Sequence, residues 1–167
     1  YVPPSDVEAI LLAHSDTREY FLFSVWKVDP AISKSIYNID LAFSACYKLK
    51  DKYKMLFLIG TEAESNKKYL MDRLSPYGIA DSVTLIFEAE LIRYLPNCKF
   101  LLRTNNVDGY GVSLQEALDL GIPAVASDVC IRPKGCVLFR NDDIVDLLDK
   151  VSNLDTYWDQ SEIESPD

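Results

Sequence analysis

Short apolar runs rich in β-branched and aromatic residues alternate with longer segments of helical character along most of this chain of 167 residues. This alternation is typical of a parallel sheet with helices on both faces, because each crossover between parallel strands needs a helix. The pattern therefore predicts an α/β domain of three layers (α/β/α) with a mainly six-stranded parallel sheet. The predicted strands are Tyr20 to Val25, Met55 to Ile59, Val83 to Phe87, Lys99 to Leu102, Pro123 to Ser127 and Cys136 to Phe139.

Helical periodicity and stop signals place the helices between these strands. From Ile39 to Leu49 the apolar residues recur at the spacing of one helix face. Pro76 and Gly78 close a polar helix, and Gly121 ends the helix that follows the fourth strand. The remaining predicted helices are Lys67 to Leu74, Leu91 to Leu95, Val112 to Leu120 and Asp142 to Val151.

The length of the chain, with 49% hydrophobic residues, is enough for one well-packed domain and too short for two large ones. We assign residues 20–154 to that domain. Residues 1–19 lack a clear pattern and are predicted to be a linker or extension, and residues 155–167 form an acidic tail. Both ends have the composition of cut linkers, so we expect a domain that lacks a neighbour.

Composition excludes several classes of function. A net charge of −9 with no run of basic residues argues against nucleic acid as a partner. The four cysteines stand singly beside one histidine, which favours reduced thiols and no metal site. No long uncharged apolar run or signal-peptide pattern is present, so a soluble, cytoplasmic domain is expected.

Two acids, Asp108 and Glu116, flank a turn with two glycines that leads into a helix. The glycines allow a ligand to approach the backbone, and the amides at the helix N-terminus favour anions. Glu116 and Asp108 could accept hydrogen bonds from hydroxyl groups on opposite sides of a pocket. This arrangement suits a phosphorylated sugar, but an ordinary strand-turn-helix also places acids near a helix start.

Ligands of open parallel sheets bind beyond the carboxyl ends of the strands, and the two-acid segment reaches that edge. Lys27 follows the first strand directly, so its ammonium group is expected at the same edge. A cation and a set of amides facing one cleft would stabilise a diphosphate. A solvated loop lysine is the alternative for Lys27.

The segment from Asp108 to Val129 is similar to a long motif of two acids with seven residues between them, followed by Glu-Ala, Gly-x-Pro and Ala-Ser-Asp. On this run, the chain from Tyr20 to about Val151 resembles the C-terminal, nucleotide-sugar-binding domain of family-4, group 1 glycosyltransferases. These are retaining enzymes of the two-domain GT-B architecture. The resemblance implies a Rossmann-like fold.

The resemblance also implies roles for individual residues. Glu116 would hydrogen-bond the ribose of the donor nucleotide, and Asp108 would lie against the transferred sugar and favour positive charge at its anomeric carbon. Lys27 would neutralise the diphosphate. The further substrate-binding residues expected at this cleft are Lys34, Phe87, Gly109, Tyr110, Gly111, Val112 and Ser113.

The chain departs from the family pattern in three ways. The first acid is an aspartate where glutamate is commoner. Trp26 stands where the family usually has glycine, so it crowds the loop expected to hold the donor phosphate. The position of the second basic residue is open, because the loop from Asp29 to Asn38 is longer than usual: Lys34 is the candidate and Tyr37 occupies the nominal position. Two arginines at the carboxyl edge, Arg103 and Arg132, could substitute or be structural.

As a whole, the resemblance implies the donor-binding half of a retaining, hexosyltransferase-like enzyme that transfers sugar from a nucleotide diphosphate sugar to a polysaccharide or glycolipid acceptor. Its partner would be a missing N-terminal acceptor-binding domain, which would also provide any peripheral contact with the inner membrane face. No cofactor or metal is expected, and the isolated domain should bind donor without turnover.

A noncatalytic α/β module that senses nucleotides or contacts other proteins is the alternative, and Trp26 with the irregular basic loop supports it. A dinucleotide-binding dehydrogenase domain is poorly supported, because no Gly-x-Gly-x-x-Gly follows the first strand.

Overall fold

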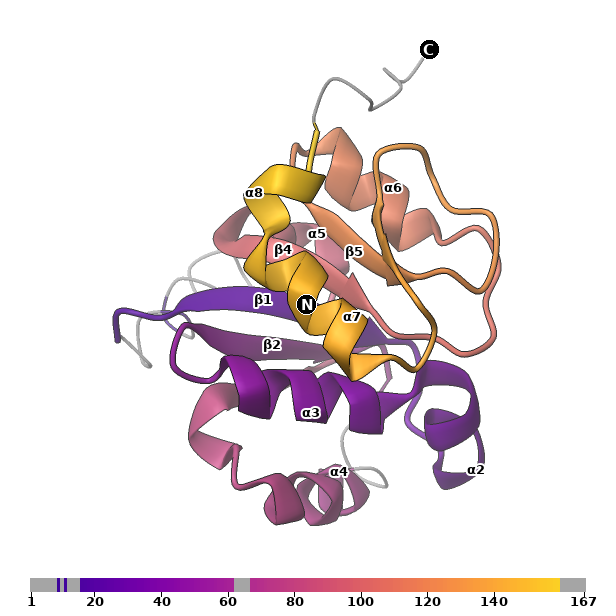
Figure 1. Ribbon diagram of the computed structural model, residues 1–167. Coiled ribbons are helices and arrows are strands. Elements are labelled where there is room, and N and C mark those ends of the chain that lie inside the picture. The colour runs from indigo at the N-terminus through magenta and orange to yellow at the C-terminus, as the bar shows by residue number, and fades with distance from the viewer. Residues whose placement is uncertain (1–8, 10, 12–15, 62–66, 160–167) are drawn as a thin grey trace.

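The computed structural model describes residues 9, 11, 16–61 and 67–159, and these residues contain one six-stranded sheet (Figure 1). The strand order is β3-β2-β1-β4-β5-β6, and every pair of neighbouring strands is parallel. The predicted α/β, Rossmann-like fold with a six-stranded parallel sheet is therefore confirmed. The strands are β1 (Glu19–Val25), β2 (Tyr53–Ile59), β3 (Val83–Phe87), β4 (Cys98–Arg103), β5 (Ala124–Ser127) and β6 (Val137–Phe139).

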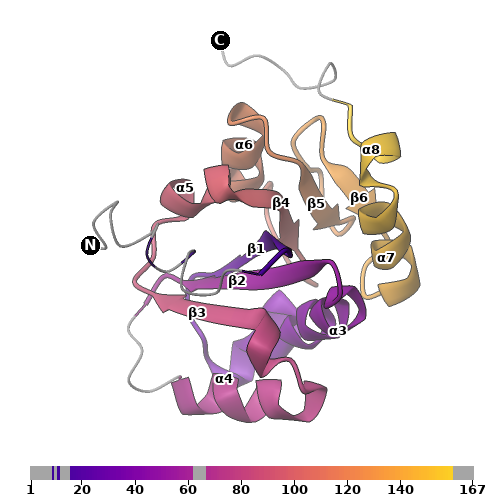
Figure 2. The ribbon, with the colours of Figure 1, turned by 90° about the vertical axis from the view of Figure 1, so that its left-hand side faces the viewer.

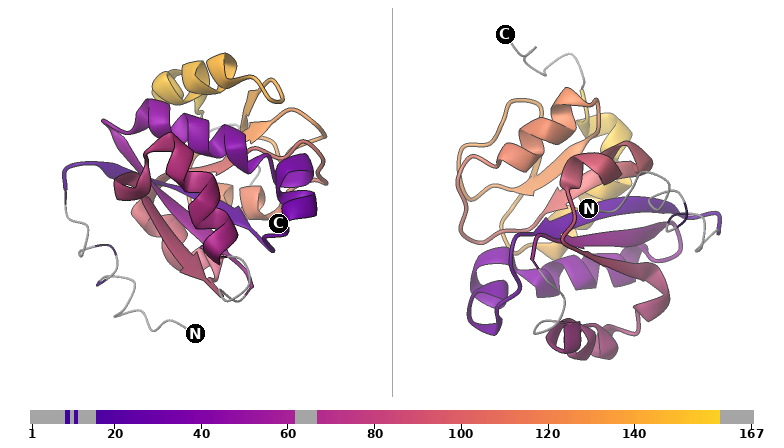
Figure 3. Two further views of the ribbon diagram at one scale, coloured as in Figure 1. Left: turned by 90° about the horizontal axis from the view of Figure 1, so that it is seen from below. Right: turned by 180° about the vertical axis from the view of Figure 1, so that it is seen from behind.

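Helices cover both faces of the sheet, which gives the three layers visible edge-on in Figure 2. One face carries α3 (Ile39–Leu49), α4 (Lys67–Leu74) and α7 (Ile144–Ser152), and the other carries α5 (Leu91–Tyr94) and α6 (Val112–Asp119), seen from behind in Figure 3. The shorter elements are α2 (Pro30–Ile32), α8 (Leu154–Tyr157), a π-helical turn η1 (Ser33–Tyr37), and the 3-10 turns η2 (Ser75–Tyr77), η3 (Ala80–Ser82) and η4 (Leu95–Asn97).

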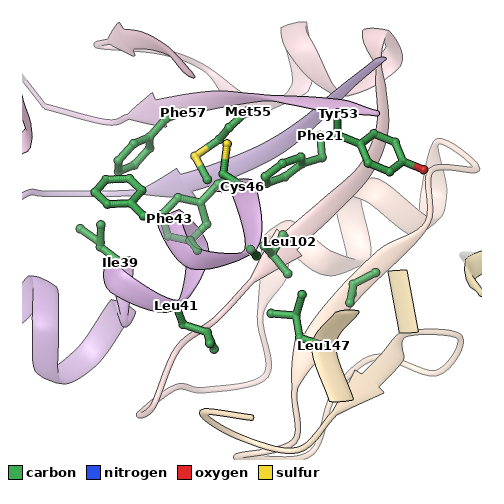
Figure 4. Close-up of a cluster of buried hydrophobic side chains, with 14 of the residues drawn as sticks. Phe21, Ile39, Leu41, Phe43, Cys46, Tyr53, Met55, Phe57, Leu102 and Leu147 are labelled. Atoms are coloured by element: carbon green, nitrogen blue, oxygen red, sulfur yellow. The ribbon is translucent and has the colours of Figure 1, made fainter. Parts of the chain in front are cut away.

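Most positions of the strands are apolar, because both faces of the sheet are largely buried. In β1, Phe21 and Phe23 point into the cluster beneath α3, α4 and α7, while Leu22 points into the cluster beneath α5 and α6. Figure 4 shows the first cluster, in which aromatic rings from several elements meet. The rings of Phe21 and Phe100 stack with centroids 5.1 Å apart, which ties β1 to β4.

The observed element bounds agree with the predicted ones to within about two residues, and the loop after β1 is the main feature that the pattern did not predict. That loop contains α2 and η1, and it ends at Asn38 in a left-handed conformation with φ 51°. At the C-terminal end, the segment predicted as an acidic tail begins inside α8, and Trp158 packs against both core clusters. The remainder of the predicted tail (160–167), and most of the predicted linker (1–19), lie outside the described residues.

The chain changes direction across the sheet between β1 and β4. The first crossovers lead from β1 outward to β2 and β3, and the chain then returns to β4 on the other side of β1. The crossovers that leave β1 and β4 lead to helices on opposite faces of the sheet, α3 and α6, and the carboxyl ends of these two strands border a crevice. In sheets with this order, 3-2-1-4-5-6, that crevice is where ligands bind.

Candidate functional site

A cavity of about 520 Å³ lies at this crevice. The ends of β1, β2 and β4, the start of α6 and the segment around α5 all contribute to its walls. The lining residues are Ser24, Val25, Trp26, Tyr37, Leu58, Gly60, Ala89, Glu90, Leu91, Ile92, Arg103, Ser113 and Glu116. The predicted position of the site, at the carboxyl edge beside the two-acid segment, agrees with the location of this cavity.

The loop after β1 reaches the cavity because hydrogen bonds join it to the loop after β4. The hydroxyl of Thr104 donates to the carbonyl oxygen of Tyr37 at 2.8 Å, and the amide of Asn106 donates to the carbonyl oxygen of Ile36 at 2.8 Å. Thr104 is fully buried. These bonds hold Tyr37, at the nominal position of the second basic residue, in the cavity wall.

Arg103, the last residue of β4, lies in the cavity wall with its guanidinium held by Asp108. Its Nε donates to Asp108 Oδ2 and its Nη2 donates to Asp108 Oδ1 at 2.7 Å. Its Nη1 donates to the Ser113 hydroxyl at 3.2 Å. Arg103 therefore connects the end of β4, the first acid and the start of α6.

Arg132 also binds the carboxylate of Asp108. Its Nη1 donates to Asp108 Oδ2, and its Nε and Nη2 donate to the carbonyl and hydroxyl oxygens of Ser127 at 2.9 and 3.1 Å. The Arg132 side chain is 1% exposed, and it does not line the cavity. All three of its nitrogens are engaged by protein acceptors, so Arg132 is fixed in place.

Asp108 is consequently a buried anion between two cations, and only 7% of its side chain is exposed. Burial by itself raises the pKa of a carboxyl group, but hydrogen bonds from Arg103 and Arg132 outweigh it and hold the pKa of Asp108 below its ordinary value. Asp108 is therefore ionised at neutral pH. Both of its oxygens are occupied, and it does not line the cavity.

The N-cap of helix α6 is Gly111, which has φ 90° and ψ 75°. No side chain caps this N-terminus, so the first amides of the helix lie at its positive end without a side-chain acceptor. Ser113 and Glu116, one helical turn apart, face the cavity. The Glu116 carboxylate has no hydrogen-bond or ion-pair partner among the described residues, which leaves it available to accept hydrogen bonds from a ligand.

Trp26 forms part of the cavity rim, although 72% of it is exposed. Its ring lies over the end of β2, where a Cβ added to Gly60 would come within 2.5 Å of Trp26 Cε3. Gly60 is thus required by the position of the tryptophan. The two residues together form an apolar part of the cavity wall.

The structure brings together only some of the residues that the sequence singled out. Ser113 and Glu116 line the cavity, and Gly111 starts the helix that carries them. The other predicted substrate-binding residues do not line it. Lys27 and Lys34 are exposed, and Phe87 packs against the core cluster beneath α3. The turn into α6 also has exposed residues, namely Gly109, Tyr110 and Val112.

The sequence indicated Arg103 and Arg132 only as substitutes for the second basic residue. It did not indicate the cavity-lining segment from Ala89 to Ile92, which leads into α5. One signal was available for Arg103, because it directly follows the apolar residues Phe100 to Leu102 at the carboxyl end of a strand, where ligands of such sheets bind. No local pattern marks Arg132, because it meets Asp108 only through the crossover between β4 and β5.

The described residues hold neither a cluster of metal-binding side chains nor a helix suited to span a membrane. No group of three or more His, Cys, Asp or Glu side chains is placed to hold a metal ion within those residues. In the same part of the chain, no helix has the length and apolar character needed to cross a membrane.

Comparison with known proteins gives one family match and many structural matches. The family model described as "Glycosyl transferases group 1" matches residues 31–136. A search of curated proteins finds no match.

Among solved structures, sucrose-phosphate synthase from Thermosynechococcus elongatus superposes with a TM-score of 0.70 at 17% identity, covering 93% of this chain and 40% of that one. HepE from Anabaena, in complex with UDP-glucose, superposes with a TM-score of 0.69 at 14% identity and covers 92% and 45%. A glycosyltransferase from Rickettsia africae gives a TM-score of 0.73 at 9% identity and covers 92% and 42%. The chain thus spans less than half the length of each of these structures.

Proposed function

The chain belongs to the group 1 glycosyl transferase family, and from this we propose that it is the donor-binding half of a glycosyltransferase. The proposed ligand is a nucleotide diphosphate sugar. Support for the ligand class comes from HepE, a protein of similar fold that was solved with UDP-glucose. The chain's short length relative to the solved structures supports an additional domain that would bind the acceptor.

One observation carries the proposal: a cation, a free carboxylate and an uncapped helix N-terminus meet at a single cavity. Arg103, Ser113 and Glu116 line that cavity at the crevice between β1 and β4. A nucleotide diphosphate sugar has phosphates that need cations or amides, and ribose hydroxyls that need an acceptor. The three groups match these two requirements.

In the proposed complex, Glu116 accepts hydrogen bonds from the ribose hydroxyls. The amides of Val112 and Ser113 contact the distal phosphate and the sugar, at the positive end of α6. Trp26 and Gly60 form the apolar wall of the site. No metal ion takes part, so binding should be the same in the presence of a chelator such as EDTA.

The proposal extends to the complete protein as a retaining glycosyltransferase with a polysaccharide or glycolipid acceptor, acting in the cytoplasm or at the inner membrane face. Acceptor binding belongs to the other domain, and the reaction takes place between the two. The isolated chain should therefore bind donor without turnover, because the acceptor is not positioned and water is not excluded.

A titration of the isotope-labelled chain with UDP and GDP, followed by amide NMR shifts, tests the proposal. Saturable shifts around Arg103, Glu116 and the start of α6 are expected with one nucleotide. Glu116→Gln should weaken binding by about 1–3 kcal/mol, the contribution of a hydrogen bond to a charged acceptor. The control is Asp119→Asn, which removes one negative charge from an exposed position of the same helix.

Two results would contradict this reading. A folded wild-type chain that binds neither nucleotide would refute the proposed donor site. Unchanged affinity in a folded Glu116→Gln variant would remove Glu116 from the site while leaving nucleotide binding intact.

A further inference from the structure

Among the described residues that line the cavity, Arg103 is the only cation. We propose that Arg103 of β4, oriented by Asp108, binds the diphosphate of the donor. This inference rests on the proposed function. The loop after β1 would then not supply the principal cation. Asp108 takes a positioning role, in place of the contact with the transferred sugar that the family resemblance implies.

The hydrogen bonds of Arg103 leave part of its guanidinium free for a ligand. Arginine has five N–H donors, and Arg103 uses three of them within the described residues, two toward Asp108 and one toward Ser113. One N–H remains on each terminal nitrogen. The side chain is 21% exposed, and it is part of the cavity wall. These two donors are therefore available to phosphate oxygens.

Arg132 differs from Arg103 in this respect, although it binds the same carboxylate. Its three nitrogens are engaged by Ser127, Asp108 and the carbonyl oxygen of Gly109, and its side chain is closed to solvent. Arg132 can therefore fix the carboxylate of Asp108 but cannot reach a ligand. The fixed carboxylate then holds Arg103 through two parallel hydrogen bonds, a geometry that sets the plane of the guanidinium.

The charge of this cluster also suits an anion. Two arginines and one carboxylate leave one excess positive charge in a protein whose net charge is −9. The Ser113 hydroxyl, bonded to Arg103, lies in the first turn of α6, so the cation and the positive end of the helix adjoin. Their combined field favours a phosphate between them.

The lysines of the loop after β1 are placed less well for this task. Lys27 and Lys34 are both exposed, and neither lines the cavity. Trp26, directly before Lys27, lies over Gly60 and lines the cavity where the lysine does not. A flexible, hydrated lysine must lose side-chain entropy to bind phosphate, whereas Arg103 is already held in place.

The test compares ligands that differ only in the number of their phosphate groups. Binding of uridine, UMP and UDP, and of guanosine, GMP and GDP, is measured by calorimetry on the wild-type chain and on Arg103→Gln and Lys27→Gln. The Arg103→Gln variant should lose about tenfold to a hundredfold in affinity for the diphosphate, while its affinity for the nucleoside changes less than twofold. Lys27→Gln should stay within about threefold for every ligand.

Two further variants separate ligand binding from structure. Arg103→Lys keeps the positive charge but lacks the planar guanidinium group, so it should retain more diphosphate affinity than Arg103→Gln. Arg140→Gln removes an exposed arginine just after β6, outside the cavity, and controls for overall charge. Asp108→Asn releases the orientation of Arg103, so it should reduce diphosphate affinity without changing nucleoside affinity.

The outcomes distinguish this inference from the proposed function. If the wild-type chain binds the diphosphate, and Arg103→Gln keeps that affinity while Lys27→Gln loses it, the role of Arg103 is refuted and the donor site stands. If the wild-type chain binds no nucleotide, both fail. Loss of the diphosphate preference in Arg103→Gln alone supports both.

Discussion

Asp108 illustrates how a single residue can take a role that its sequence motif does not reveal. The motif places an acid before the glycine turn, and in the folded chain that acid lies between Arg103 and Arg132. A buried carboxylate needs such partners, since an unpaired charge away from water is strongly unfavourable. The ion cluster is therefore as much a structural element of the loop after β4 as it is a part of the candidate site.

Asp108→Asn should reduce the free energy of unfolding by roughly 3 kcal/mol at neutral pH, because two buried arginine contacts lose their charged partner. Urea denaturation followed by circular dichroism measures this. Glu90→Gln, which breaks the exposed pair between Glu90 and Arg93, is the control and should change stability by less than about 0.5 kcal/mol. Equal effects of the two variants would contradict a buried ion cluster.

The same variant tests the pH dependence. The pKa of Asp108 is lower in the folded chain than its ordinary value of about 4, so its stabilising contribution is fully present above that pH and is lost as the pH falls through the folded value. The wild-type chain should therefore lose stability below about pH 4 more steeply than Asp108→Asn does. Parallel curves for the two proteins would show that Asp108 is not paired in this way.

At the scale of elements, the start of α6 depends on one glycine. Gly111 has φ 90°, which L-residues rarely adopt, and a Cβ there would lie 2.8 Å from Leu114 Cδ1 and 3.3 Å from Arg132 Nη1. Gly109, two residues earlier, has open space around its Cβ position. The two glycines of the turn therefore differ: the fold requires glycine at position 111, whereas position 109 has space for a side chain.

Gly111→Ala should destabilise the chain by about 1–3 kcal/mol, through the strained φ and the clash with Leu114. Gly109→Ala is the matched control and should stay within about 0.5 kcal/mol. Thermal or urea unfolding of both variants measures the difference. A Gly111→Ala variant as stable as the wild type would mean that α6 can begin with another backbone conformation.

At the scale of the whole molecule, the sheet separates two hydrophobic clusters, and Trp158 is in contact with both. The chain has two tryptophans, and they lie in contrasting places. Trp158 is partly buried beside the core, and Trp26 is exposed at the rim of the cavity. The fluorescence of Trp158 should therefore report on folding, and the fluorescence of Trp26 should report on the site.

Nucleotide binding should change the fluorescence of Trp26, because it lies in the cavity wall. The signal should disappear in Trp26→Phe and persist in Trp158→Phe, whereas the unfolding signal should follow Trp158. Fluorescence titration with UDP and GDP measures the first, and denaturation in urea measures the second. A ligand signal that survives in Trp26→Phe would place the nucleotide away from the rim.

The strands and helices could be predicted because their signals are local. Hydrophobic periodicity fixed α3 and β3 to the residue, and Gly78 and Gly121 marked where helices end. The loop after β1 could not be predicted in this way. Its π-helical turn and the left-handed Asn38 are held by hydrogen bonds with residues far away in the sequence. The Thr104 hydroxyl donates to the Asn38 carbonyl oxygen, and the Asn38 side-chain amide donates to Asn106 Oδ1.

The sequence by itself determined the α/β architecture and the position of the two-acid segment at the carboxyl edge, since both follow from the order and periodicity of local elements. Only the tertiary structure decided that Asp108 is enclosed by Arg103 and Arg132, that Glu116 is left open to the cavity, and that Arg103 is the cation facing it. The physical reason is distance along the chain. Arg132 reaches Asp108 only after the parallel crossover through α6 and β5 has brought their loops together, and no pattern within either loop encodes that meeting.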